Sequence, residues 1–294
     1  MASLESKLFN LLLTIINKKK FLDLQFAFKE FDFYSSKEPP KEVHRACHVE
    51  QRQVNGRNVF TLSSREHKST QHILYLHGGA YVQNFLKQHW RFLATLVKET
   101  HCTVTAPDYP LAPEFTFVEA YAMVVPLYQE LVSQAGAENT ILMGDSAGGG
   151  FALGLAQKMS AEHQSSPAKI ILLSPWLDIT LSNPDVQKID ATDPFLSARA
   201  LRKAGLAFAG DAEPRQPMLS PINGSLQGLG EITVFIGSRD LLVADARRLQ
   251  RLAKEQKVTI NYREYPDMVH VWMFLYFRES RQAKREIIEL VKSI

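Results

Sequence analysis

The chain has 294 residues, which fits one large domain or a domain with a small appendage. Its formal net charge is only +3 and its longest basic run is Lys18-Lys19-Lys20, which argues against nucleic acid as a partner. Two cysteines, Cys47 and Cys102, are too few for a disulfide framework or a cysteine-based zinc site, so we expect a reducing compartment, the cytoplasm. No apolar run has the length of a membrane span, so stable membrane insertion is not expected.

The first residues predict an amphipathic helix with one apolar face. The apolar residues that recur at helical spacing are Leu4, Leu8, Leu11, Leu12, Ile15 and Ile16. Flanking charges and the lack of an A-x-A-like cleavage site argue against a signal peptide. We expect the apolar face to pack on the protein itself. The alternative is that it lies on a membrane surface with the three lysines toward the headgroups.

An aromatic-rich segment and a β-hairpin come next. The segment ends at Pro39-Pro40, so we take residues 1–40 as an N-terminal cap segment and residues 41–294 as the main domain. Residues 43–62 favour a hairpin, because Asn55-Gly56 is a two-residue turn between alternating runs.

From residue 72 the pattern alternates between apolar strands and amphipathic helices. The expected strands are 73–76, 102–106, 140–143, 170–173, 232–236 and 258–263, and the expected helices are 85–99, 117–133, 147–160, 241–255 and 271–293. This order predicts an α/β fold with a parallel sheet, helices on both faces and a site at the carboxyl ends of the strands. Residues 178–222 break the alternation with five prolines and one helical piece, which indicates an insertion that caps those strand ends.

The stretch Gly144-Asp145-Ser146-Ala147-Gly148 joins an expected strand to an expected helix. A nucleophile elbow needs this context, because its serine must stand at the tip of a tight turn to reach a carbonyl carbon. The two glycines let strand and helix approach without Cβ clashes. We expect Asp145 to face away from the pocket and to anchor the elbow. Since G-x-S-x-G alone is a weak motif, the alternative is a glycine-rich turn without a chemical role.

A second small-residue loop, His77-Gly78-Gly79-Ala80, follows the strand expected at 73–76. Ester or amide hydrolysis develops negative charge on the carbonyl oxygen, and fixed backbone amides can stabilise it. We expect the amides of Gly78, Gly79 and Ala147 to form this oxyanion hole.

A serine nucleophile needs a histidine base, and the base needs a carboxylate to orient it. His270 lies between the last strand and the last helix, whereas the other histidines outside the glycine loop have no such position. Asp240 follows the preceding strand. Asp245, inside the next helix, and Asp267, in a tight loop, are its rivals. The order Ser146, Asp240, His270 is that of an α/β-hydrolase.

With these motifs the chain resembles the hormone-sensitive lipase family of α/β-hydrolases, which contains many small bacterial esterases. The matching stretches are 77–81, 108–114, 144–149, 174–178, 237–240 and 268–270. The resemblance implies an eight-stranded, mostly parallel sheet with a helical cap, serine carboxylesterase activity without a cofactor, and a triad of Ser146, Asp240 and His270. Three departures are Ala80, where the family often has a third glycine, Pro110, where it commonly has an arginine, and Val271, where a glycine commonly follows the histidine.

We therefore predict a serine carboxylesterase that hydrolyses short-to-medium acyl esters through an acyl-enzyme on Ser146. Tyr81, Trp176 and Phe26 are assigned to the substrate pocket. An arylformamidase or amidase would use the same triad and stays open, as does a lipase that works at lipid surfaces with the first helix as anchor. The alternative from another class is a non-catalytic, ligand-binding member of the fold. The expected partner is a small-molecule ester, and a homodimer is left open.

Overall fold

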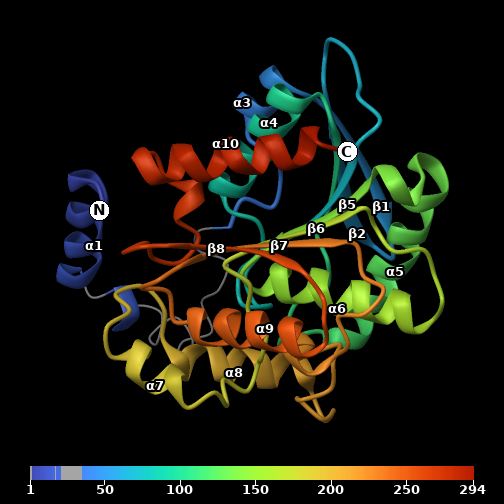
Figure 1. Cartoon of the computed structure of the whole chain (residues 1–294). Helices are drawn as coiled ribbons and strands as arrows, with labels where there is room; N and C mark the ends of the chain where they lie inside the picture. The colour runs from blue at the N-terminus through green and yellow to red at the C-terminus, as the bar shows by residue number, and fades with distance from the viewer. Residues whose placement is uncertain (1, 17, 21–34) are drawn as a thin grey trace.

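A computed structural model describes residues 2–16, 18–20 and 35–294. In these residues the chain forms an eight-stranded sheet of order β1-β2-β4-β3-β5-β6-β7-β8, with helices on both faces (Figure 1). The pairings of β1 with β2 and of β2 with β4 are antiparallel, and the others are parallel. The predicted α/β-hydrolase fold with a mostly parallel sheet is confirmed.

The strands expected after residue 72 are all present, with small differences at their ends. The strands are β1 (His48–Val54), β2 (Arg57–Ser63), β3 (His72–Leu76), β4 (Thr103–Pro107), β5 (Thr140–Asp145), β6 (Lys169–Leu173), β7 (Glu231–Gly237) and β8 (Ile260–Tyr265). The helices are α1 (Leu4–Ile15), α3 (Lys41–Ala46), α4 (Lys87–Thr100), α5 (Phe117–Ala135), α6 (Ala147–Ala161), α7 (Asp185–Asp190), α8 (Ala198–Ala209), α9 (Val243–Glu255) and α10 (Arg278–Lys292), with short 3₁₀ turns η1 (Ala137–Asn139), η2 (Pro221–Asn223) and η3 (Trp272–Phe274).

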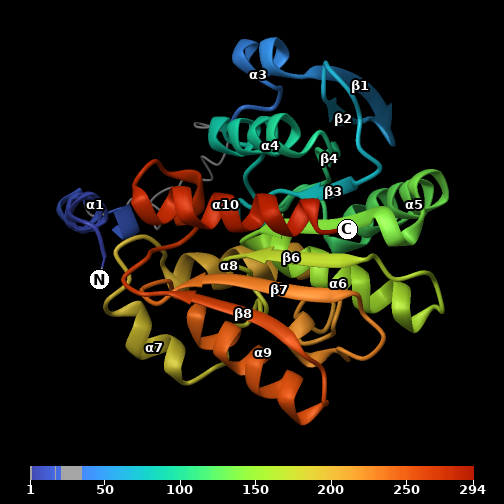
Figure 2. The ribbon, with the colours of Figure 1, turned by 45° about the horizontal axis from the view of Figure 1, so that its top comes forward.

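Two hydrophobic cores lie on the two faces of the sheet. Helices α3, α4 and α10 cover one face, and α5, α6, α8 and α9 cover the other (Figures 1 and 2). Successive residues of a strand enter opposite cores, as Ile73 and Leu74 do in β3. Because both faces are covered, β5 and β6 are buried along their whole length, which explains why they read as continuous apolar runs.

Two expected boundaries are wrong, and the insertion contains one helix more than expected. Residues 41–46 form α3, so the hairpin begins at His48. Its turn lies at Asn55-Gly56 as predicted, with positive φ at both residues. The last helix begins at Arg278 rather than at residue 271, because Val271 is left-handed and η3 follows it. The insertion at 178–222 contains α7 as well as the expected helical piece, α8.

Helix α1 packs on the protein through its polar side. The amide and hydroxyl of Ser3 donate to the Glu279 carboxylate of α10 at 2.7 and 2.8 Å, and Asn10 Nδ2 donates to the Asp267 carbonyl at 3.0 Å. The predicted apolar face is exposed instead, with exposed fractions between 51% for Leu12 and 74% for Leu4. Our expectation that this face packs on the protein is therefore wrong. The aromatic-rich segment at 21–34, with Phe26, lies outside the described residues.

Candidate active site

Ser146 stands in a strained turn between the end of β5 and the start of α6. Its φ and ψ are 52° and −121°, its amide donates to the Leu173 carbonyl at 2.9 Å, and its carbonyl accepts from the Trp176 amide at 2.8 Å. A Cβ on Gly148 would lie 2.0 Å from the Leu76 carbonyl oxygen, and one on Gly144 would lie 2.2 Å from the Gly148 carbonyl oxygen. The expected reason for both glycines, a close approach of strand and helix, is confirmed.

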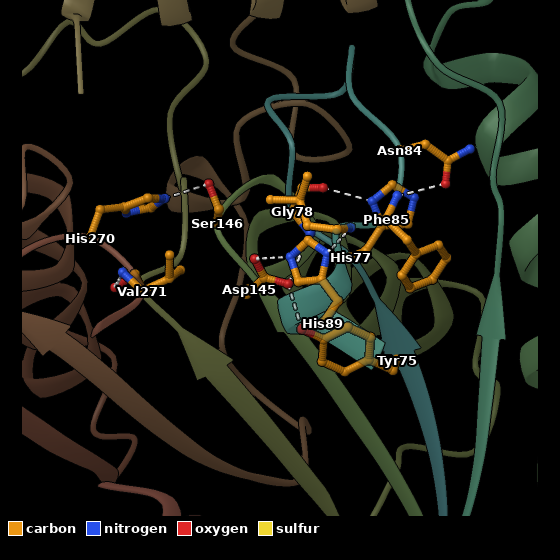
Figure 3. A network of polar contacts seen from close by, with 12 residues as sticks. Tyr75, His77, Gly78, Asn84, Phe85, His89, Asp145, Ser146, His270 and Val271 are labelled. Carbon is orange, nitrogen blue, oxygen red and sulfur yellow. Dashed lines mark hydrogen bonds and ion pairs between the residues drawn. The ribbon is translucent and has the colours of Figure 1, made fainter. Parts of the chain in front are cut away.

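The side chains of Ser146, His270 and Asp240 meet at the carboxyl ends of β5, β8 and β7. His270 Nε2 lies 2.9 Å from Ser146 Oγ (Figure 3), and His270 Nδ1 lies 2.9 Å from Asp240 Oδ2. All three are buried. The rivals of Asp240 lie elsewhere: Asp245 accepts from Asn183 Nδ2 at 3.0 Å, and Asp267 is exposed. The arrangement has the connectivity of a serine nucleophile, its base and an orienting carboxylate.

The carboxylates around His270 set its proton affinity. Burial by itself lowers the pKa of His270, but the charge and hydrogen bond of Asp240, with smaller contributions from Asp193 and Asp145, raise this pKa above its ordinary value. Asp240 is itself oriented, because its Oδ1 accepts from the Leu242 amide at 3.0 Å.

Asp193 is a second buried carboxylate beside the triad, which the sequence did not single out. Its Oδ2 accepts from the Leu241 amide at 2.7 Å, and its Oδ1 accepts from the amides of Phe195 and Leu196 at 2.6 and 3.1 Å. Burial, followed by the nearby charge of Asp240, raises the pKa of Asp193 to about 6. Asp193 thus ties the segment between α7 and α8 to the loop that carries Asp240. The one sequence signal that could have identified Asp193 is its position before Pro194 within the insertion.

Asp145 anchors the elbow from behind, as expected. Its Oδ1 accepts from the Tyr75 hydroxyl at 2.5 Å and from the Gly78 amide at 2.9 Å, and its Oδ2 lies 3.2 Å from His89 Nε2 (Figure 3). Burial alone would raise the pKa of Asp145, but the His89 ring, the Tyr75 hydroxyl and the Gly78 amide hold this pKa below its usual value. The carboxylate is therefore ionised and serves structure, since Ser146 Oγ is bonded to His270 instead.

His89 is a member of this network that sequence reasoning missed. The Leu86 amide donates to its Nδ1 at 2.9 Å, so Nε2 carries the proton that faces Asp145. No local motif could have identified His89, because its role depends on how α4 packs against β5.

His77, in the glycine loop, donates from Nδ1 to the Gly78 carbonyl at 2.6 Å, and burial lowers the pKa of His77 to about 3.

The amides near Ser146 differ in whether they are already bonded. The Gly78 amide donates to Asp145, so it is not available to an oxyanion, which corrects our expectation for this residue. In the part of the chain that the structure describes, no protein acceptor is found for the amides of Gly79, Ala80 and Ala147. Gly79 has φ of 123°, and a Cβ there would lie 2.2 Å from the Gln83 carbonyl oxygen, so only glycine fits.

Two residues assigned to the substrate pocket lie inside the hydrophobic core. Tyr81 is 2% exposed and stacks on Phe208 of α8 with ring centroids 4.0 Å apart, and Trp176 is fully buried with its Nε1 donating to the Asp178 carbonyl at 2.8 Å. The side chains of Tyr81 and Trp176 therefore belong to the core that packs against α6 and α8, and they do not line a pocket. The third assigned residue, Phe26, is outside the described residues.

A group with metal-ligand chemistry lies away from the triad. Glu66, His67 and His101 hold ligand atoms within 4.8 Å of one another, and among the described residues no other such group is found. His101 lies two residues before β4, at the amino ends of the parallel strands, whereas Ser146, Asp240 and His270 lie at the carboxyl ends. This group takes no part in the site.

Val271 stores backbone strain beside the base. It has φ of 46° and ψ of 36°, which is an outlier for a β-branched residue, and its amide donates to Ser174 Oγ at 3.1 Å. The left-handed conformation that the family's glycine would adopt freely is thus kept with valine in place.

The strain predicts an inverted stability order at this position. We expect the free energy of unfolding, measured by denaturant titration, to be about 1 kcal/mol higher for Val271→Gly than for Val271→Ala. The reason is that alanine keeps the left-handed strain and glycine does not. At an exposed helical position such as Lys203 the same pair should show the usual order, with glycine about 1 kcal/mol less stable. Equal stability of the two Val271 variants would contradict the assigned strain.

Comparisons with known proteins identify the family of the chain. A model of the α/β-hydrolase fold matches residues 73–274. The chain is 32% identical over 231 residues to an esterase of Acinetobacter venetianus (77% of this chain, 76% of that protein) and 31% identical over 214 residues to an acetyl-hydrolase of Streptomyces hygroscopicus (72% of each).

Solved structures give the same result. An esterase of the bacterial hormone-sensitive lipase family is similar with a TM-score of 0.79 and 29% identity over 84% of each chain. The crystal structure of EstE5, soaked with p-nitrophenyl butyrate, is similar with a TM-score of 0.85 and 25% identity, over 99% of this chain and 98% of that one. The chain therefore belongs to the α/β-hydrolase family, in the branch of hormone-sensitive lipase-like esterases.

Proposed function

We propose that the protein is a serine carboxylesterase that hydrolyses short-to-medium acyl esters through an acyl-enzyme on Ser146. The observation that carries this proposal is the pair of 2.9 Å hydrogen bonds that link Ser146 Oγ to His270 and His270 to Asp240. Relatives with the printed names esterase, acetyl-hydrolase and ethyl acetate hydrolase support ester bonds as the target.

The reaction has two acyl-transfer steps. His270 Nε2 takes the proton of Ser146 Oγ while this oxygen attacks the ester carbonyl, and the imidazolium then protonates the leaving alcohol. Water repeats the sequence, with His270 again as base, and releases the acid. Asp240 stays ionised throughout, holding the ring so that Nε2 faces the serine.

The negative charge of the tetrahedral intermediate needs donors that are not already used. We assign the oxyanion hole to the amides of Gly79, Ala80 and Ala147, because these have no acceptor among the described residues. Gly78 contributes indirectly, since its bond to Asp145 fixes the loop relative to the elbow. Losing one such donor typically costs about 10²–10³ in rate.

We propose the cytoplasm as the compartment, on the state of the two cysteines. Cys47 and Cys102 are both free and buried, and burial raises the pKa of Cys47 to about 11 and that of Cys102 to about 12. Two protonated, unpaired thiols suit the reducing cytoplasm.

Hydrolysis of nitrophenyl esters from acetate to laurate tests the activity directly. We expect turnover with an optimum at a short or medium chain and a loss of at least about 10³-fold in kcat for Ser146→Ala. Wild-type protein that is inert on all the esters but active on aryl formamides would favour an arylformamidase. Inertness toward both classes would favour a ligand-binding protein.

The pH profile tests the electrostatics around the base. Because the reaction needs neutral His270, kcat/KM falls as the pH drops through its pKa, which the nearby carboxylates raise. We expect Asp193→Asn to shift this acid limb to lower pH, since one of those negative charges is removed. The exposed carboxylate of Asp185 on α7 provides the control, and Asp185→Asn should leave the limb in place. An unchanged limb in Asp193→Asn would contradict the assigned coupling.

A further inference from the structure

The exposed apolar side chains of the molecule are concentrated on α1. Among the described residues nine large hydrophobic side chains are exposed, and six of them belong to α1 and its C-cap residue. A helix on a globular protein normally turns its apolar stripe toward the core. Here the buried positions are Ser6, Asn10 and Leu13, and the opposite side carries the apolar face defined by Leu4, Leu8, Leu11, Leu12, Ile15 and Ile16.

Specific hydrogen bonds fix the orientation of α1 about its own axis, and this orientation exposes the apolar face. Ser3 is held by Glu279 of α10 and Asn10 by the carbonyl of Asp267. Phe9, on the boundary of the apolar face, packs against Phe277 with ring centroids 6.1 Å apart. Figures 1 and 2 show α1 at one edge of the molecule, beside the first turns of α10. The apolar face is thus presented outward by the polar contacts on the other side of the helix.

Exposed charged residues lie near this face, and most of them are basic. Lys7 and Glu5 lie on α1 itself, and Arg278 and Arg281 lie on the first turns of α10, whose Glu279 binds Ser3. Two lysines that the sequence placed toward headgroups face the protein instead: Lys19 pairs with Asp190 at 2.6 Å, and Lys18 lies over the Phe195 ring. An exposed apolar helix face in a region with net positive charge fits the boundary between acyl chains and anionic headgroups.

The size of the face favours a lipid surface over a second copy of the chain. A helix of 12 residues is about 18 Å long and about 10 Å across. A stable protein–protein interface needs about 800 Å² from each partner, which is more than one side of such a helix offers. A lipid surface needs no matching partner, since burial of the apolar side chains in the acyl region suffices. Within the described residues no helix has the length and apolarity to cross a membrane.

The end of this helical segment lies close to the triad. Lys18 Nζ is 6.0 Å from the centre of the Phe195 ring, and this ring is 5.8 Å from the ring of His270. Asp190, the partner of Lys19, accepts from the Ala198 amide at the start of α8. The chain that leaves α1 therefore runs along the segment between α7 and α8, which packs on the catalytic base.

From these observations we propose that the apolar face of α1 docks the protein on an anionic phospholipid surface. Docking in this orientation brings the side of the molecule that carries Phe195 and His270 near the lipid, where apolar esters concentrate. The use of lipid-dissolved esters as substrates rests on the proposed esterase function, but the docking itself does not.

Vesicle binding of the full chain tests the proposal. The probe is a phosphatidylcholine vesicle with about one third phosphatidylglycerol, separated by flotation, with a pure phosphatidylcholine vesicle alongside. We expect binding that is tighter to the anionic vesicle and weakens with salt. Leu8→Gln combined with Ile15→Gln should lower the partition coefficient about tenfold or more, because two of the six apolar side chains are lost. Val118→Gln, at another exposed apolar position, on α5, should bind like the wild type.

Two results would overturn the proposal: absence of wild-type protein from the vesicle fraction, or equal binding by the double variant. A wild-type dimer in sedimentation velocity that becomes monomeric in the double variant, without vesicle binding, would assign the face to a second copy. Turnover of soluble nitrophenyl acetate separates this test from the esterase proposal. Docking without any turnover would remove only the esterase, and turnover without docking would remove only the lipid surface.

Discussion

The rest of the site depends on one buried carboxylate, that of Asp145. It ends β5 immediately before Ser146 and binds the Tyr75 hydroxyl of β3, the Gly78 amide of the glycine loop and the His89 ring of α4. A buried charge is tolerated only when it is fully bonded, so each of these groups is held where the carboxylate needs it. The same bonds fix the loop of Gly79 and Ala80 relative to the elbow. These contacts behind Ser146 thereby set the distance between Ser146 and the amides that we propose as oxyanion donors.

The orientation of His270, the proposed base, comes from a second series of contacts on the other side of Ser146. Asp193 accepts from the Leu241 amide, Asp240 accepts from the Leu242 amide, and the carboxylate of Asp240 holds His270 Nδ1. These contacts join the segment between α7 and α8 to the loop that follows β7. This segment is thus linked to His270 through hydrogen bonds as well as through the Phe195 ring. Movement of this segment would therefore change the position of the His270 ring.

The sequence was sufficient for features that depend on local pattern or on a short motif. Alternating strands and helices predicted the parallel part of the sheet, and the turn motif located Ser146, because Gly144 and Gly148 are required by close backbone contacts. Features that depend on which segments meet in space were not predictable. The use of the Gly78 amide by Asp145 needs the approach of β3 and β5, and the outward apolar face of α1 needs the polar contacts of Ser3 and Asn10. An amphipathic pattern alone does not say which face packs.

Covalent labelling tests the central claim, that Ser146 is a nucleophile activated by His270. The protein would be incubated with a fluorophosphonate, and the adduct would be counted by intact mass and located by peptide mapping. The account predicts one adduct per chain, on Ser146, formed far more slowly in His270→Ala and absent in Ser146→Ala. An adduct on another residue, or a labelling rate that His270→Ala leaves unchanged, would contradict it.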